Sequence, residues 1–378
     1  MYILGIDTSC DETSAAVIEN SCILSNVVSS QANFHRAYGG VVPSIAKLNH
    51  QLKIDKVVNM ALKRAGIQFN DLEYIAVTIG PGLAIALEVG INFAKKISTE
   101  FKIPIIPINH MEGHLWSFFL QPHKRDFDRW SNNNSISYPS LGVLISGGHS
   151  EFILVEGFRK YTKIGETLDD ACGECLDKCA RTIGLGYPGG IVLAKLANIY
   201  RHRFIINVIN NIQLKYVQIT SKYDSNISFM LPIPKSTSLD FNLSFSGLKT
   251  AFNNLVSSIK KLDKEIIFAL CVLLEATAMY SILVKIEKII EKYKDIKELW
   301  LGGGVVANNL LNKLLRRFAK QQNLVIRKPY SKKLTGDNAA MIALIAYLNF
   351  IHNIRYSYNI DKIDRIPSLD ITETSLLY

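Results

Sequence analysis

The sequence predicts an α/β protein built from two related lobes. Strand and helix patterns alternate through the first 110 residues, and the same order recurs loosely after residue 140. In each half a glycine-containing segment stands between a strand and a helix. The repeat is one of pattern and not of residue identity. If the loops of the two lobes face each other, a ligand cleft is expected between them.

The first half opens with three short strands joined by tight turns. The expected elements are strands over 2–6, 14–19 and 22–28, a helix over 44–64, a strand over 74–79, a helix over 83–101 and a strand over 103–108. Gly66 ends the first helix, and Gly80-Pro81-Gly82 separates the next strand from its helix. The order β-β-β-α-β-α-β is typical of a layered α/β domain.

The second half repeats this plan with additions. The expected elements are strands over 141–145, 151–155, 298–301 and 324–327, with helices over 305–320 and 336–350. We therefore assign the first lobe to 1–110, together with part of the C-terminal helix region, and the second to 111–350. The polar stretch 121–138 is expected to be an exposed loop, and 200–237 an insertion with two irregular strands. The tail 351–378 lacks a strong pattern, so only docking is expected to order it.

The charge balance favours an anionic partner. Lys and Arg number 43 against 33 Asp and Glu, a formal net charge of +10, and nucleic acid is the first candidate. An equally weighted alternative is that the surplus of basic residues has no role in binding. Ile, Lys, Asn and Tyr are abundant throughout, as if codon bias had filled positions that tolerate substitution. The hydrophobic fraction of 48% indicates a globular enzyme and excludes a disordered or fibrous chain.

Two features bear on the cellular compartment. The start of the chain has no basic region before its apolar residues, so no secretory signal is expected. The apolar stretch 266–284 carries only Glu275, but a mid-segment carboxylate is costly in lipid, which favours a buried helix over a membrane span. A cytoplasmic protein with reduced cysteines follows. Cys172, Cys175 and Cys179 lack a fourth ligand of matching spacing and are interpreted as buried apolar residues rather than a zinc site.

His110 and His114 are the first candidates for a metal site. They are four residues apart, which places both imidazoles on one face of a helix that follows a strand. A pair at this spacing can hold a divalent ion, although two unrelated histidines at a helix start are an equal alternative. The third ligand is expected to be a carboxylate, and Asp337 is a candidate. Its simpler role is a helix N-cap, and the two roles are compatible.

The remaining candidate functional residues lie in two kinds of turn, one rich in polar side chains and the other rich in glycine. The segment from Asp7 to Thr13 holds three carboxylates and three hydroxyls, enough to position a nucleophile or to take its proton, although turns favour such residues anyway. Glycines at 147–148, 189–190 and 302–304 let backbone N–H groups approach a phosphate, and we favour nucleotide binding over purely structural turns.

Nine colinear segments together resemble the tRNA threonylcarbamoyladenosine transferase family (TsaD), in its bacterial form. They run from near the N-terminus to about residue 350. The segments are ILGIDTSCDET at 3–13, YGGVVP at 38–43, NHMEGH at 109–114, SGGH at 146–149, DDACGE at 169–174, YPGG at 187–190, SFSGLKT at 244–250, GGGVVAN at 302–308 and DNAAMI at 337–342.

The resemblance implies an actin-like ATPase (duplicated ribonuclease H-like) fold and transfer of a threonylcarbamoyl group from threonylcarbamoyl-AMP to N6 of the adenosine 3′ of the tRNA anticodon. It implies a metal, Fe²⁺ or else Zn²⁺, on His110, His114 and Asp337. The residues implied for the adenylate are Leu144, Ile145, Ser146, Gly147, Gly148, Asp177, Gly190 and Asn308. The implied partners are tRNA, a TsaB-like paralogue, a small TsaE-like ATPase and a separate synthase of the adenylate. Asp11 is our candidate for orienting the amine or accepting its proton.

The chain departs from the family pattern at a few positions. Ser44 and Leu48 replace a Glu and an Arg, Gly336 replaces a Thr, and Glu88 stands in a normally apolar helix. These changes bear on efficiency and partner contacts more than on the reaction class. Three rival functions stay open here: a kinase or ATPase of the same fold acting on a small metabolite, a non-catalytic nucleic-acid or scaffold protein, and a metallopeptidase. The lack of H-E-x-x-H argues against the last.

Overall fold

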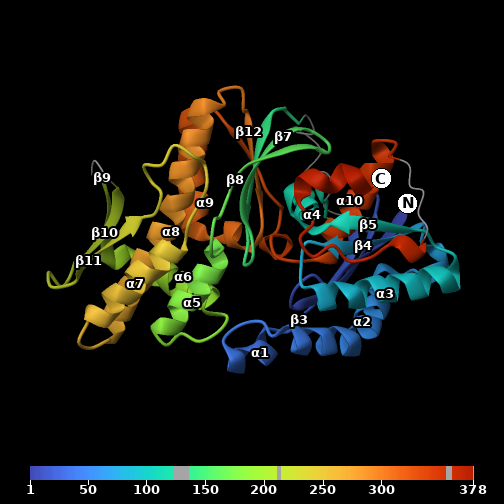
Figure 1. Ribbon diagram of the computed structural model, residues 1–378, viewed down its shortest axis with the longest axis horizontal. Coiled ribbons are helices and arrows are strands. Elements are labelled where there is room, and N and C mark those ends of the chain that lie inside the picture. Colours follow the sequence, from blue (N-terminus) through green and yellow to red (C-terminus); the bar gives the residue numbers. More distant parts are fainter. Residues whose placement is uncertain (123–135, 211–213, 355–359, 378) are drawn as a thin grey trace.

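The computed structural model describes residues 1–122, 136–210, 214–354 and 360–377. Two five-stranded sheets and a smaller three-stranded sheet form the framework (Figure 1). Helices cover the outer faces of the two large sheets, and two further helices lie between these sheets. The mixed α/β class predicted from the alternating pattern is confirmed.

The first sheet has the strand order β3-β2-β1-β4-β5. Its strands and outer helices are β1 (Tyr2–Asp7), β2 (Glu12–Glu19), β3 (Cys22–Ser30), α2 (Pro43–Ala65), β4 (Tyr74–Gly80), α3 (Ala84–Phe101) and β5 (Ile105–Asn109). The first three strands pair antiparallel, whereas β4 and β5 run parallel to β1. All seven lie where the sequence pattern placed them, and Gly66 ends α2 in the left-handed conformation, as expected.

The second sheet has the order β13-β12-β6-β7-β8, which is the same plan read from its other end. Its strands are β6 (Ser140–Ile145), β7 (Ser150–Gly157), β8 (Lys160–Glu166), β12 (Glu298–Gly302) and β13 (Val325–Arg327). Strands β6, β7 and β8 are antiparallel neighbours, and β12 and β13 are parallel to β6. The predicted duplication is therefore confirmed. The sequence pattern missed β8, because its charged residues hide the alternation.

Two helices form a layer between the sheets. They are α4 (His110–Trp116) and α10 (Ala339–Ile351). Their apolar residues share one core with residues of both sheets, including the ring of Trp116, which packs against that of Trp300 with centroids 4.9 Å apart. The division of the chain at residue 110 stays a prediction: α4 contacts strands of both sheets, and α10 packs on the first sheet and on α4.

The second lobe carries most of the remaining helices. They are α5 (Cys172–Thr182), α6 (Gly189–Tyr200), α7 (Ser246–Ser258), α8 (Lys264–Lys292) and α9 (Asn309–Gln322). Helix α8 is the one helix in the described residues that is long and apolar enough to cross a membrane, and 78% of its most apolar window is buried inside the protein. Its buried Glu275 pairs with Arg201 and accepts a hydrogen bond from Nδ2 of Asn308 at 2.7 Å. The predicted buried helix is confirmed, and Arg201 and Asn308 compensate its buried carboxylate, which the sequence did not predict.

The insertion differs from its prediction. It forms a regular antiparallel sheet of β9 (Phe204–Asn210), β10 (Lys215–Ser221) and β11 (Ser228–Ile233), so the expectation of two irregular strands was wrong. Alternating buried residues such as Val217 and Ile219 face α8, a pattern that the many Asn and Lys residues obscure. The predicted loop 121–138 falls largely outside the described residues.

Short elements complete the chain. They are α1 (Ala32–His35) and the 3-10 turns Arg36–Tyr38, Phe69–Asp71, Ser117–Phe119, Arg201–Arg203, Gly304–Ala307, Lys332–Leu334, Ile360–Lys362 and Ile371–Leu377. The last two belong to a C-terminal segment that docks on the end of β4 and beside β8. Docking does order this segment, as expected from its lack of pattern.

Candidate metal and acyl-adenylate site

The two histidines meet at the start of α4, directly after β5. Asn109 caps this helix: its side-chain oxygen accepts hydrogen bonds from the backbone N–H groups of Met111 (2.8 Å) and Glu112 (3.1 Å). The rings of His110 and His114 lie one turn apart with centroids 4.7 Å apart and planes perpendicular. Both side chains are buried, so the strand and its cap aim them into the layer between the sheets.

Asp337 reaches the same point from the other end of the chain. Its Oδ1 atom lies 3.1 Å from Nε2 of His114 and 3.5 Å from Nε2 of His110. One ligand atom from each of the three residues lies within 4.8 Å of the others. The cap of α10 is Asn338, whose Oδ1 accepts from the N–H of Met341, so the simpler interpretation of Asp337 as that cap was wrong.

Asp7 stands behind the histidine pair. Its fully buried carboxylate lies 3.5 Å from Nδ1 of His110 and accepts hydrogen bonds from the backbone N–H and the hydroxyl of Ser9. Carboxylates in this position fix the ring orientation and the protonated nitrogen of metal-binding histidines. The sequence analysis singled out Asp7 only as a member of a polar turn. Its position at the end of β1, next to the end of β5 across β4, was the available signal.

The charges in this group shift its pKa values in opposite directions. Burial lowers the pKa of His110, but the carboxylates of Asp7 and Asp337 outweigh it and raise this pKa to about 10. Burial also lowers the pKa of His114, and there it prevails. Burial would raise the pKa of Asp337, but the histidine charges and hydrogen bonds hold it well below its usual range. The same group of charges acts on His149, because burial and the two histidines lower its pKa to about 4.

This arrangement fits a divalent cation. Nε2 of each histidine faces Oδ1 of Asp337, so one potential ligand atom from each residue points to the same place. Two imidazoles and one carboxylate are a donor set suited to Zn²⁺ or Fe²⁺, and three protein ligands leave positions open for other groups. The three residues could therefore hold a metal ion.

The hairpin turn between β1 and β2 lies beside the histidines. Burial, followed by the charges of Asp11 and Asp337, raises the pKa of Glu12 to about 10, so this side chain stays protonated at neutral pH. The turn is held by His50 of α2, whose ring nitrogens lie 2.8 Å from Oγ1 of Thr13 and 3.0 Å from the carbonyl oxygen of Cys10. Asp11 is half-buried, and its backbone carbonyl accepts a hydrogen bond from the N–H of Gln31.

The glycine loops divide into open and packed positions. A Cβ atom added at Gly147 or Gly148 would meet nothing within 4 Å, so these residues of the β6–β7 turn leave room for a ligand. At Gly302 a Cβ would lie 2.5 Å from the carbonyl oxygen of His114, and at Gly303, with φ +91°, 2.4 Å from that of Ile145. Backbone packing thus requires glycine at 302 and 303, which favours the structural interpretation there. Leu144, Ile145 and Ser146 are buried in the strand leading to the open turn.

The other predicted adenylate residues lie in α5, α6 and α9, and the protein itself satisfies their polar atoms. Asp177 of α5 accepts a hydrogen bond from the N–H of Gly190 at 2.6 Å, which ties α5 to the start of α6. Asn308 caps α9 through Leu310 and Leu311, while its amide nitrogen donates to Glu275. The structure brings Asp177 and Gly190 into direct contact.

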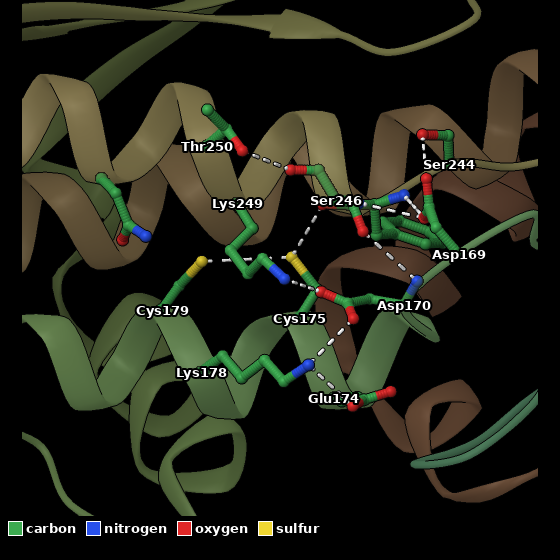
Figure 2. A network of polar contacts seen from close by, with 12 residues as sticks. Asp169, Asp170, Glu174, Cys175, Lys178, Cys179, Ser244, Ser246, Lys249 and Thr250 are labelled. Atoms are coloured by element: carbon green, nitrogen blue, oxygen red, sulfur yellow. Dashed lines mark hydrogen bonds and ion pairs between the residues drawn. The ribbon is translucent and has the colours of Figure 1, made fainter.

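A polar network joins α5 to the start of α7 (Figure 2). Asp169 accepts hydrogen bonds from the N–H groups of Phe245 and Ser246 at the start of α7, and Asp170 pairs with Lys178 of α5 and Lys249 of α7. The first turn of α5 in turn touches the open turn, because the N–H of Gly173 donates to the carbonyl oxygen of Ser146 at 3.2 Å. The network therefore fixes the distance between α5 and the open glycines.

Comparison with known proteins now assigns the family. The family model described as "tRNA N6-adenosine threonylcarbamoyltransferase" matches residues 22–344. The chain belongs to this family. A relative of that name from Phocaeicola vulgatus is 40% identical, with 93% of this chain and 94% of the relative aligned. Another from Bacillus subtilis is 36% identical, with 98% and 96% aligned. Members of the family are acyltransferases.

A solved structure supports the fold. Full-length HypF, in a phosphate- and nucleotide-bound form, matches 93% of this chain with a TM-score of 0.51 and 10% sequence identity. The match covers 46% of the HypF chain, and at this identity it shows the fold alone. The chain has the actin-like ATPase fold, as the resemblance implied, with two sheets of the same strand order.

The departures from the family pattern have structural settings. Ser44 and Leu48 lie on the exposed face of α2, where neither loss leaves a buried charge. Glu88 of α3 is paired with Lys47 at 3.2 Å and with Arg365 at 3.4 Å. Gly336 precedes Asp337 at a position where a Cβ would meet nothing within 4 Å, so nothing in the packing requires glycine there.

The three cysteines are confirmed as buried apolar residues. Cys172, Cys175 and Cys179 are fully buried and free, on the face of α5 that enters the second-lobe core. Burial raises the pKa of the Cys172 thiol to about 12. Neutral thiols in an apolar core are poor metal ligands.

Proposed function

We propose that this chain transfers a threonylcarbamoyl group from threonylcarbamoyl-AMP to N6 of the adenosine 3′ of the anticodon in tRNA. The observation that carries the proposal is the convergence of His110, His114 and Asp337 in a chain of this family. A kinase acting on a small metabolite has no specific observation in its favour.

We assign the metal to these three residues, with Fe²⁺ favoured over Zn²⁺. A divalent ion bound there would supply Lewis-acid polarisation of the acyl carbonyl and a template for the substrate oxygens. The chain's part is to hold the donors: Asn109 sets the start of α4, and Asp7 orients the ring of His110. Because the ligands come from the starts of two helices in the central layer, the site is rigid on both sides.

The adenylate would occupy the space in front of the open β6–β7 turn. Gly147 and Gly148 offer backbone without side chains, and Leu144 to Ser146, Asp177, Gly190 and Asn308 form its surroundings. In the reaction a bond forms between N6 and the acyl carbon, the bond from that carbon to the phosphate oxygen breaks, and AMP leaves as an anion. Backbone N–H groups can stabilise this anion without a general acid.

Asp11 is proposed to orient the amine and to accept the proton that N6 loses. Glu12 is protonated at neutral pH, because burial and the charge of Asp11 raise its pKa to about 10, and so it cannot take this role. The turn that carries Asp11 also faces the second lobe: burial raises the pKa of Tyr187, and the charge of Asp11 raises it further.

The reaction is proposed to take place in the cytoplasm with a TsaB-like paralogue and a small TsaE-like ATPase. The test uses the purified chain with these partners, synthetic threonylcarbamoyl-AMP and tRNA, followed by nucleoside mass spectrometry. We expect threonylcarbamoyladenosine from the wild-type chain and a loss of about 100-fold or more in rate for Asp11→Asn. Asp224→Asn, at an exposed turn of the insertion, is the matched control. Undiminished transfer by Asp11→Asn would remove that assignment, and no transfer by the wild-type system would remove the function.

A further inference from the structure

We propose that the C-terminal segment Ile366–Thr374, called the strap below, is a positioning element for the histidine pair. It acts through Asn109, the residue that caps α4. The inference rests on the proposed metal site and goes beyond it, because it assigns a role to a segment that follows the last family motif.

The strap lies directly on the end of β4. The N–H of Ile366 donates to the carbonyl oxygen of Ile79 at 2.7 Å, and the N–H of Gly82 donates to that of Pro367 at 3.0 Å. A Cβ added at Gly80 would lie 1.9 Å from the carbonyl oxygen of Ile366, so only glycine permits this approach. The backbone of the strap is thus in direct contact with the backbone at the end of β4 and in the loop that follows it, with no side chain between them.

The strap determines the orientation of the Asn109 amide. Nδ2 of Asn109 donates to the carbonyl oxygens of Leu369 (3.3 Å) and Asp370 (3.2 Å). The other end of the same buried amide, Oδ1, therefore faces the N–H groups of Met111 and Glu112. A flipped amide would point its two donors at these N–H groups and would leave the first turn of α4 without its acceptor.

The strap also holds the opposite sheet. Asp370 accepts a hydrogen bond from Nζ of Lys163 on β8 at 2.6 Å, and the same lysine pairs with Glu166 at 2.7 Å. Leu369 and Ile371 flank Asp370 and are buried, which anchors the strap on both sides of this ion pair. One short segment thus joins the ends of β4 and β5 in the first sheet to β8 in the second, beside the residue that precedes His110.

A purely stabilising tail would behave differently from a positioning element. If the strap only added stability, variants that stay folded would bind metal like the wild-type chain. If it orients Asn109, folded variants that lose the contact bind metal more weakly, because supporting residues of metal ligands typically change affinity by about 10–100-fold.

The experiment measures Zn²⁺ affinity by competition with a chelator, and the visible spectrum of the Co²⁺-substituted protein. Asn109→Asp keeps the cap acceptor but removes the donor to the strap, and should weaken Zn²⁺ binding by about 10-fold or more. Asn312→Asp also removes an amide that donates to two backbone carbonyl oxygens, in α9 of the second lobe, and should leave Zn²⁺ affinity unchanged. Lys163→Met should weaken binding by only about threefold, less than the roughly 10–100-fold of a supporting residue, because Lys163 contacts Asp370 and not Asn109 itself. Its matched control, Lys235→Met, breaks the remote pair of Lys235 with Asp240.

Circular dichroism establishes that each variant is folded. If Asn109→Asp fails to fold, Asn109→Ser replaces it, because serine also caps helices and also lacks the donor. Wild-type affinity and an unshifted Co²⁺ spectrum in folded Asn109→Asp (or Asn109→Ser) and Lys163→Met would overturn the role of the strap. These readouts do not use tRNA, so a chain that binds metal but fails to transfer would refute the proposed function while leaving the strap test readable.

Discussion

The two ends of the candidate site differ in how complete they are. At the histidine end, Nε2 of His114 and Nε2 of His110 face Oδ1 of Asp337 at 3.1 and 3.5 Å, so three potential metal ligands converge on one point. At the glycine-loop end, Asp177 is bonded to Gly190 and Asn308 to Glu275, so the side chains already satisfy one another.

This difference indicates two modes of binding. Two imidazoles and one carboxylate that converge can bind one cation together, so the histidine end gains most from a divalent ion that all three side chains coordinate at once. At the glycine-loop end the polar side chains already have partners within the protein, and a ligand finds only backbone groups and open space at Gly147 and Gly148. Ligand binding at the histidine end should therefore depend on single side chains, whereas binding at the glycine-loop end should depend on the shape of the turn.

The largest effect is expected at the histidine end. Asp337→Ala removes one of the three proposed ligands, and should weaken Zn²⁺ binding by more than the roughly 100-fold that marks the upper range for supporting residues. Isothermal titration of the metal-free protein measures this loss. Asp177→Asn, the matched change at the glycine-loop end, should leave metal affinity at the wild-type level. Equal losses in both variants would contradict the division of the site.

The packed glycines give the next largest effect. Gly303→Ala places a Cβ 2.4 Å from the carbonyl oxygen of Ile145 in a left-handed backbone conformation. We expect a loss of about 2–3 kcal/mol in the free energy of unfolding, measured by urea denaturation. Gly304→Ala, where a Cβ meets nothing within 4 Å, should change it by less than about 0.5 kcal/mol. A tolerated Gly303→Ala would show that the loop can shift, and the distinction between packed and open glycines would fail.

A buried network below the histidines predicts a smaller effect. Glu112 lies between them on α4, is fully buried, accepts a hydrogen bond from the hydroxyl of Tyr161 at 2.9 Å and pairs with Arg159 at 3.6 Å. Glu112→Gln keeps the shape but removes the charge opposite Arg159, and should cost about 1–2 kcal/mol of stability. Tyr161→Phe removes this hydrogen bond together with the one that the Tyr161 hydroxyl accepts from Nε1 of Trp116, and the same urea titration measures its effect. A Glu112→Gln protein as stable as wild type would mean that the ion pair only offsets its own desolvation.

The smallest expected effect is a pH dependence of stability, which arises at the β1–β2 turn that His50 holds. Burial lowers the pKa of His50, so the folded protein favours the neutral ring. A lowered histidine pKa gives stability that is present above the unfolded value of about 6.5 and is lost as pH falls through the folded pKa. Thermal unfolding between pH 8 and pH 4 should therefore show a steeper loss for wild type than for His50→Gln. Parallel profiles would show that His50 does not contribute to the acid sensitivity.

The sequence predicted the parts of the fold whose pattern is local. Strand alternation, helical spacing and glycine stops placed β1 to β5 and both strand–glycine–helix units. The pattern failed at β8 and in the insertion, where Lys and Asn replace the apolar residues that define a period. At the site, their spacing alone paired His110 with His114. Asp337 was one candidate for the third ligand on its position at a helix start, and the family motif singled it out. Asp7 and Asn109 were missed as supports because their roles depend on contacts between strand ends and on the strap, which no local pattern records.

The distance along the chain between the ligands has a consequence for biosynthesis. His114 and Asp337 are 223 residues apart, and Asp337 lies just before the last long helix. While the ribosome is still making the middle of the protein, the emerging chain holds two histidines without their carboxylate and without α10, which completes the central layer. The proposed three-ligand centre can form only after Asp337 and α10 have been made, so shorter nascent chains should compete poorly for the cell's metal.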